Sequence, residues 1–289
     1  MTGPIKSNTA ERIYSPQSVV KRPGLLFRHM LQDLAAARYL AWRILVRDLK
    51  ARYRQTLLGS FWIVIPPIFV AIGLTFATRT KVIQIAATDL PYPVFVVLSM
   101  SLWLTFTEAV NAPLQAINES RSVLAKISFP REALLIARFA DVTTSLLVRM
   151  LLVAAVFLWY RVAVTPLGLL AIPATFSLVL FGFAVGLLLA PFGTLYHDII
   201  KGTPIVLNML FFLTPVVYPT PQGDNIFAQL VNWNPITPLL ITVRELATGV
   251  PLSAGTGYLV LSMVAVLGLF LAWVLYKVSL PFVIERLSS

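Results

Sequence analysis

The chain has 289 residues, of which 58% are hydrophobic and only 12% are charged, and its mean hydropathy is +0.82. A soluble domain of this length has no use for so much apolar surface, so the composition excludes the soluble classes and indicates a polytopic membrane protein. The net charge of +11 raises a nucleic-acid interface as an alternative, but 11 of the 23 lysines and arginines precede residue 60. That distribution fits the positive-inside rule and an anionic membrane surface better than a groove for nucleic acid.

The N-terminal part predicts a cytoplasmic tail over residues 1–24, followed over residues 25–59 by an amphipathic helix at the membrane interface. Four cations share one face of this helix because they are spaced 4, 3 and 4 residues apart: Arg43, Arg47, Lys50 and Arg54. An apolar stripe lies about 120° around the helix from these cations: Trp42, Leu45, Leu49 and Tyr53. Arg52 stands off the cationic stripe, and we expect it to contact protein or lipid elsewhere. The alternative for the whole region is a basic flank that only sets membrane topology.

Apolar segments in residues 60–278 predict an all-α domain of six transmembrane helices, at 60–78, 94–117, 133–159, 166–192, 203–218 and 258–278. Pro66 and Pro67 remove two backbone donors, which predicts a kink or an interruption in the first helix. The fifth segment, at about 16 residues, is short for the ~20 that a spanning helix needs. In the outer stretch 219–252, prolines divide apolar clusters, and this pattern predicts two half-helices in a re-entrant hairpin.

An even number of spans places both termini on one side of the membrane. Most lysines and arginines then lie on that side, including those of the connection 118–132 and the tail 279–289, so both termini are expected in the cytoplasm. Four cations are expected on the outer side: Arg79, Lys81, Arg161 and Arg244.

Glu108, Asp141 and Arg149 fall well inside predicted spans and must face protein or water rather than lipid. We expect Glu108 to be packed against a partner, and Asp141 to form a local ion pair with Arg138, three residues before it. Gly182 and Gly186 form a GxxxG motif, which permits two helices to approach closely but is common by chance.

The sequence shows no machinery for hydrolysis. It has no phosphate-binding loop, no nucleophile elbow and no HExxH motif, and it lacks cysteine. His29 and His197 are isolated, so we expect no metal site on this chain. Three hypotheses remain: a proton-coupled carrier that uses Glu108, a pore for a large anionic or amphiphilic substrate, and a glycan or lipid enzyme. The sequence lacks the cluster of carboxylates or histidines that is expected of such an enzyme.

Several stretches resemble, in the right order, the type-two ABC export permeases of polysaccharides and polyol phosphates, the Wzm-like and teichoic-acid family. The resemblance covers residues 43–289. It is carried by RDLKARYRQTLLGSFWIVIPP (Arg47–Pro67), VLAKISFPREALL (Val123–Leu135), HDIIKGTPIVLNMLFFLTPVVYP (His197–Pro219), NWNPITPLLITVRELATG (Asn232–Gly249) and the tail IERLSS. Two departures are His197, where the family commonly has arginine, and the unusually charged residues 119–122.

The resemblance implies a permease subunit in the inner membrane that is not an enzyme and carries no cofactor. Two copies would pair, and a cytoplasmic ATP-binding subunit, also in two copies, would bind ATP and magnesium. The substrate would be a lipid-linked polysaccharide such as an O-antigen or a capsule, or alternatively a teichoic acid. Implied sites are the substrate headgroup site (Arg43, Arg47, Lys50, Arg52 and Arg54), the ATPase coupling site (Val123, Lys126, Phe129, Pro130 and Arg131) and the outer gate (Thr214, Pro215, Tyr218 and Pro219).

Overall fold

The computed structural model describes residues 23–54, 59–119, 132–223 and 225–288. Within these ranges the chain forms helices and no strand, which confirms the all-α class for this part of the protein. The elements are, in chain order, α2 (Pro23–Arg54), α3 (Phe61–Arg79), α4 (Tyr92–Glu119), α6 (Glu132–Trp159), the short 3-10 helix η1 (Pro166–Leu170), α7 (Ala171–Leu195), α8 (His197–Phe212), α9 (Ile226–Trp233), α10 (Ile236–Thr248) and α11 (Gly255–Ser288).

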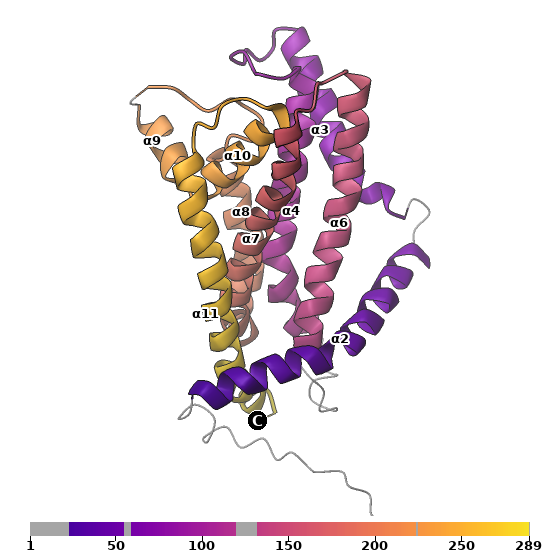
Figure 1. Cartoon of the computed structure of the whole chain (residues 1–289), viewed down its shortest axis with the longest axis vertical. Coiled ribbons are helices and arrows are strands. Elements are labelled where there is room, and N and C mark those ends of the chain that lie inside the picture. Colours follow the sequence, from indigo (N-terminus) through magenta and orange to yellow (C-terminus); the bar gives the residue numbers. More distant parts are fainter. Residues whose placement is uncertain (1–22, 55–58, 120–131, 224, 289) are drawn as a thin grey trace, which may run out of the picture.

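The helices form a bundle with one crossing helix at its base. Figure 1 shows α3, α4, α6, α7, α8 and α11 running along the long axis, with α2 across one end and α9 and α10 at the opposite end. Lys277 Nζ of α11 lies 2.8 Å from Asp33 Oδ2 of α2. The first described helix and the end of the last one therefore meet at the same end of the bundle.

Five of the described helices are long and apolar enough to cross a membrane: α3, α4, α6, η1 with α7, and α11. The count becomes six if α9 and α10, which are bent by 81° at their junction, form one broken span. The fifth predicted segment differs from the structure. Its helix, α8, starts at His197 rather than at residue 203, so the polar residues HDIIKG, expected in a loop, form the first turns of a 16-residue helix.

Burial separates the lipid-facing helices from the central one. In the span of α4, 78% of the residues are buried, against 11% in α3 and 11% in α11. The outer helices expose large apolar side chains, among them Phe69, Ile72, Met263 and Leu267. Apolar surface of this extent is stable only against lipid or another protein, and we conclude that the protein is a multi-pass membrane protein.

The helix α3 passes through Pro66 and Pro67 without an interruption. At the other end of the chain, α11 continues to Ser288, so the residues predicted to form a separate tail extend the last helix. A helix can continue past the bilayer into polar residues, so the polarity of residues 279–288 marks the limit of the membrane and not the end of α11.

The two glycines of the GxxxG motif lie where α7 packs on α4. A Cβ on Gly182 would lie 3.0 Å from the carbonyl oxygen of Phe106, and one on Gly186 would lie 2.0 Å from that of Val110. A Cβ contact of 3.0 Å is rare in real proteins, and one of 2.0 Å does not occur. The close helix approach that the motif permits is therefore confirmed, and both helices contribute residues to the main apolar core, among them Phe106, Val110 and Leu178.

The half-helices α9 and α10 have separate caps. The Asn225 side chain accepts a hydrogen bond from the Ala228 backbone N–H at the start of α9. Asn234 ends α9 and accepts a hydrogen bond from the Ile236 N–H at the start of α10. Gly249 ends α10 at φ 74°, a conformation that favours glycine. The predicted pair of short helices is thus present, with its break at the Asn234–Pro235 step.

Candidate functional site

Three of the predicted headgroup cations share the exposed face of α2. Arg43, Arg47 and Lys50 are all exposed, and Arg47 forms a surface ion pair of 2.9 Å with the neighbouring Asp48. The backbone of Arg54 belongs to the same helix, but its side chain lies outside the described residues. A row of exposed cations spaced 4 and 3 residues apart can contact several phosphate oxygens at once.

Arg52 lies on a different face and binds protein. Its Nη2 lies 2.7 Å from Asp141 Oδ2 of α6, as expected for a cation that stands off the stripe. The local pairing that we predicted for Asp141 is wrong, since its ion pair among the described side chains is with Arg52 and not with Arg138. The Arg52 side chain is 37% exposed and is engaged with a carboxylate, which separates it from the exposed cations Arg43, Arg47 and Lys50.

The face of α2 that carries Arg52 packs on α6. Ala37 and Ala41 of α2 form a buried cluster with Ala133 and Ala137 of α6, and these small side chains let the two helices lie close together. Leu45, predicted to lie among the acyl chains, is only 6% exposed and follows Ala41 on this face. The apolar stripe is therefore divided, with Leu45 inside the protein and Trp42 exposed at 63%.

An ion pair joins α4 and α6 inside the membrane-spanning region. Arg149 Nη1 lies 2.8 Å from Glu108 Oε2 and donates a hydrogen bond of 3.0 Å to the Thr105 hydroxyl. The Ser145 hydroxyl donates to the other carboxylate oxygen of Glu108 at 2.8 Å. The expectation that Glu108 is packed and partnered is confirmed, and both oxygens of its carboxylate have a neighbour.

The residues predicted to border the outer gate form one tightly bonded segment after α8. Thr214 and Pro215 are buried, and Tyr218 and Pro219 are half-buried. The Thr214 hydroxyl donates to the Leu210 carbonyl at 2.7 Å, and the Tyr218 hydroxyl donates to the Phe212 carbonyl at 2.7 Å. Both hydrogen bonds bind the segment to the last turn of its own helix.

Three residues that the sequence did not single out for this site hold the same segment from outside. Asn234 Nδ2 donates to the Thr214 hydroxyl at 2.8 Å. Arg244 Nη1 donates to the Pro215 carbonyl at 3.2 Å, and the Tyr92 hydroxyl donates to the Val217 carbonyl at 2.9 Å. Arg244, which the sequence places on the outer side within the predicted hairpin, is only 7% exposed and lies 4.4 Å above the ring of Phe95.

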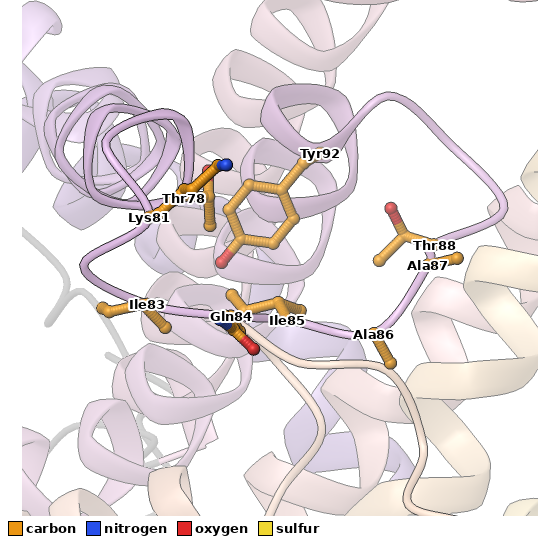
Figure 2. A pocket seen from close by; sticks show the side chains of 9 residues that line it. All are labelled: Thr78, Lys81, Ile83, Gln84, Ile85, Ala86, Ala87, Thr88 and Tyr92. Atoms are coloured by element: carbon orange, nitrogen blue, oxygen red, sulfur yellow. The ribbon is translucent and has the colours of Figure 1, made fainter.

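A pocket lies beside this segment, in the loop that joins α3 to α4. Its volume is about 500 Å³, and its lining includes Lys81, Gln84, Ile85 and Tyr92. Figure 2 shows the Tyr92 ring at the centre of these residues, with the loop passing below it. Because the Tyr92 hydroxyl binds the Val217 carbonyl, the pocket and the predicted gate share one side chain.

The predicted ATPase coupling residues, Val123, Lys126, Phe129, Pro130 and Arg131, lie outside the described residues. The next residue along the chain, Glu132, is described and begins α6. It is only 7% exposed, and its carboxylate lies 3.1 Å from Lys277 Nζ. Among the described residues, no three histidine, aspartate or glutamate side chains gather closely enough to hold a metal ion.

Comparison with known proteins gives a family and several relatives. The O-antigen export system permease protein RfbA of Myxococcus xanthus is 26% identical over 226 residues, 75% of this chain and 83% of that protein. The polysialic acid transport protein KpsM of Escherichia coli is 20% identical over 239 residues, 81% of this chain and 91% of that protein. A family model described as ABC-2 type transporter matches residues 39–247. This match covers well over half of the chain, from α2 to α10, and we conclude that the protein belongs to the ABC-2 type transporter family.

Proposed function

We propose that this protein is the membrane-spanning permease subunit of an ATP-driven exporter of a lipid-linked polysaccharide, such as an O-antigen or a capsular glycan. The observation that carries the proposal is the family match over residues 39–247, together with relatives named for O-antigen export and polysialic acid transport. ATP and magnesium are bound by a separate ATPase chain, because the sequence contains no phosphate-binding loop. Two permease chains pair, and one ATPase docks beneath each of them.

In this proposal, α2 and the C-terminal part of α11 lie at the cytoplasmic side of the inner membrane. The helix α2 with its lysine and arginine residues belongs to this side, in agreement with the positive-inside rule. The helix α2 lies in the interface, and α9 and α10, bent by 81°, form a re-entrant hairpin at the outer face. The segment 214–219 then closes the outer end of the path.

The headgroup of the lipid carrier is captured by Arg43, Arg47 and Lys50, with Arg54 completing the stripe. These three described cations are exposed and point away from the face that packs on α6. Arg52 is excluded from direct capture in this scheme, because it already binds Asp141. A teichoic acid, the alternative substrate of the resembling family, carries phosphates that the same stripe would bind, but the relatives are named for polysaccharides.

A proton-coupled carrier is the competing function from another class. It requires a carboxylate that exchanges protons during transport. Glu108 is the intramembrane glutamate available for this step in the described region, and it is occupied by Arg149 and Ser145. Both contacts come from α6 and join it to α4, and this favours a structural use of Glu108 over a proton relay.

The subunit assignment predicts that the full-length chain co-purifies with an ATPase and that proteoliposomes holding both proteins move a lipid-linked glycan only with magnesium and ATP. Changing Phe129→Asp and Arg131→Glu together is expected to remove the ATPase from the purified complex, because both residues lie in the proposed docking segment. Lys81→Glu, at the opposite end of the bundle, is the control. Transport driven by a pH gradient without ATP, or substrate conversion by the purified chain alone, would contradict the proposal.

The cationic stripe predicts a loss of substrate affinity. Changing Arg47, Lys50 and Arg54 to alanine should raise the apparent KM for the lipid-linked glycan about 100-fold, because each cation near an anionic group contributes about 1 kcal/mol. Initial export rates over a range of substrate concentrations measure this effect. Arg38→Ala is the matched control, since Arg38 is also exposed on α2 but lies off the stripe. An unchanged KM in the triple variant would show that the stripe serves topology alone.

A further inference from the structure

A three-way ion contact joins helices that are far apart in the sequence. Lys277 Nζ of α11 lies 2.8 Å from Asp33 Oδ2 of α2 and 3.1 Å from Glu132 Oε1 of α6. The contact between Lys277 and Asp33 spans 244 residues of sequence. Lys277 of the last helix is therefore the common partner of the first described helix, α2, and of the third span, α6.

These groups are shielded from solvent, which distinguishes the contact from a surface ion pair. The side chains of Lys277, Asp33 and Glu132 are 18%, 14% and 9% exposed. Surface pairs contribute little because water and salt screen them. Removal of one partner from a shielded group has a larger effect, because it leaves charge without compensation. Without Lys277, two carboxylates that now share one cation would face each other.

The helix α2 is attached to α6 at two further places. The alanines Ala37, Ala41, Ala133 and Ala137 form the buried cluster between these helices. Beyond this cluster, Arg52 of α2 binds Asp141 of α6 at 2.7 Å. The ion contact at Asp33, the alanine cluster and the Arg52–Asp141 pair follow one another along α2. Its back face is held by α6, and its cationic stripe remains exposed.

Glu132 places this attachment next to the segment that we propose docks on the ATPase. That segment, residues 118–132, ends at Glu132, which is also the first residue of α6. A displacement of the docking segment therefore acts on α6 at the residue that binds Lys277. Since α2 is attached to the same lysine, the displacement would reach the headgroup helix without passing through the rest of the bundle.

We propose that Lys277 is a positioning residue that makes α2 and α6 move as one body during the transport cycle, so that the headgroup helix follows the ATPase docking segment. This inference rests on the proposed function, because it assigns the contact to the coupling of ATP hydrolysis to export. It excludes a cycle in which α2 swings away from α6 to admit the substrate.

Cysteine pairs across the alanine cluster test the single-body motion. The chain contains no cysteine, so one of Ala37 and Ala41 and one of Ala133 and Ala137 can be changed to cysteine without other thiols reacting. Whichever of the four pairs forms a disulfide is reconstituted with the ATPase. We expect ATP-driven glycan export at the same rate before and after reduction. Export that stops on oxidation and returns on reduction would overturn the inference, because α2 would then have to leave α6.

Removal of the lysine charge tests the coupling itself. Lys277→Met is expected to raise the ATP hydrolysed per glycan exported by about fivefold or more, the lower end of energetic couplings between sites. A purely structural contact would lower export and hydrolysis together and leave this ratio unchanged. The control Lys81→Met should also leave the ratio unchanged. Lys277→Arg keeps a positive charge between Asp33 and Glu132 and should keep the ratio near its wild-type value.

These outcomes are separable from failure of the proposed function. If the wild-type complex exports no glycan with ATP, the proposed function is wrong before any variant is compared. If the wild type exports and Lys277→Met leaves the ratio unchanged, the coupling is wrong and the proposed function stands. If Lys277→Met does not accumulate in the membrane, Asp33→Asn takes its place, because it removes only the α2 side of the contact and should raise the same ratio.

Discussion

Replacing Arg149 by methionine is expected to lower the free energy of unfolding by about 3 kcal/mol, because it leaves the Glu108 carboxylate charged and unpaired between two spanning helices. We place the effect at the lower end of the range for broken buried pairs, since the Glu108 side chain is 26% exposed. Thermal unfolding of the purified protein in detergent measures this loss. The change also removes the donor to the Thr105 hydroxyl.

The double variant separates a charge effect from a packing effect. Glu108→Gln combined with Arg149→Met removes both charges and should recover most of the lost stability, because neutral groups of similar shape leave no isolated charge. Arg47→Met is the surface control, since Arg47 pairs with Asp48 at the same kind of distance but is 71% exposed, and its loss should cost less than about 1 kcal/mol. Equal destabilisation by the single and double variants would contradict the view that the isolated Glu108 charge causes the loss of stability.

The same double variant bears on the competing function. A proton-coupled carrier that used Glu108 would lose transport when the carboxylate became an amide. A permease in which the pair only stabilises the helices should keep ATP-driven export whenever the double variant folds. Export by this variant would therefore exclude Glu108 as a proton relay.

The partners of the charged residues could not be read from the sequence. Helical spacing placed Arg138 near Asp141, but Arg52, 89 residues away, takes that position. Helical spacing did place Arg52 off the cationic stripe, because the face on which a residue lies depends only on the helical period. It could not identify Asp141 as the partner, because that contact depends on how α2 packs on α6 through their alanines.

The sequence predicted which segments form helices better than it predicted where those helices end. Long apolar runs located α3, α4, α6, α7 and α11, since the thickness of the bilayer sets their length. The prolines of the stretch 219–252 indicated its division into two short helices, because the local backbone decides such a break. The contacts that hold the segment predicted to border the outer gate come from Tyr92, 125 residues from its acceptor, and from Arg244, 29 residues from its own. Contacts of that separation leave no local pattern.

Gly186→Ala is expected to destabilise the protein by about 3 kcal/mol or to prevent its accumulation in the membrane, because the added Cβ would lie 2.0 Å from the Val110 carbonyl oxygen and 2.8 Å from Pro113 Cγ. The obstructing atom belongs to the α4 backbone, so the contact is relieved only if α7 and α4 move apart. That separation would also loosen the core that Phe106 and Val110 form with α7.

Two other helical glycines make this prediction specific to the crossing of α7 and α4. A Cβ on Gly73 of α3 or on Gly202 of α8 would meet nothing within 4 Å. Alanine at either position should be neutral or stabilise the helix by up to about 1 kcal/mol, since glycine is the weaker helix former. Membrane yield and thermal unfolding compare the three variants. If Gly186→Ala matched the two controls, α7 would not approach α4 as closely as the structure shows, and the GxxxG motif would have no packing role.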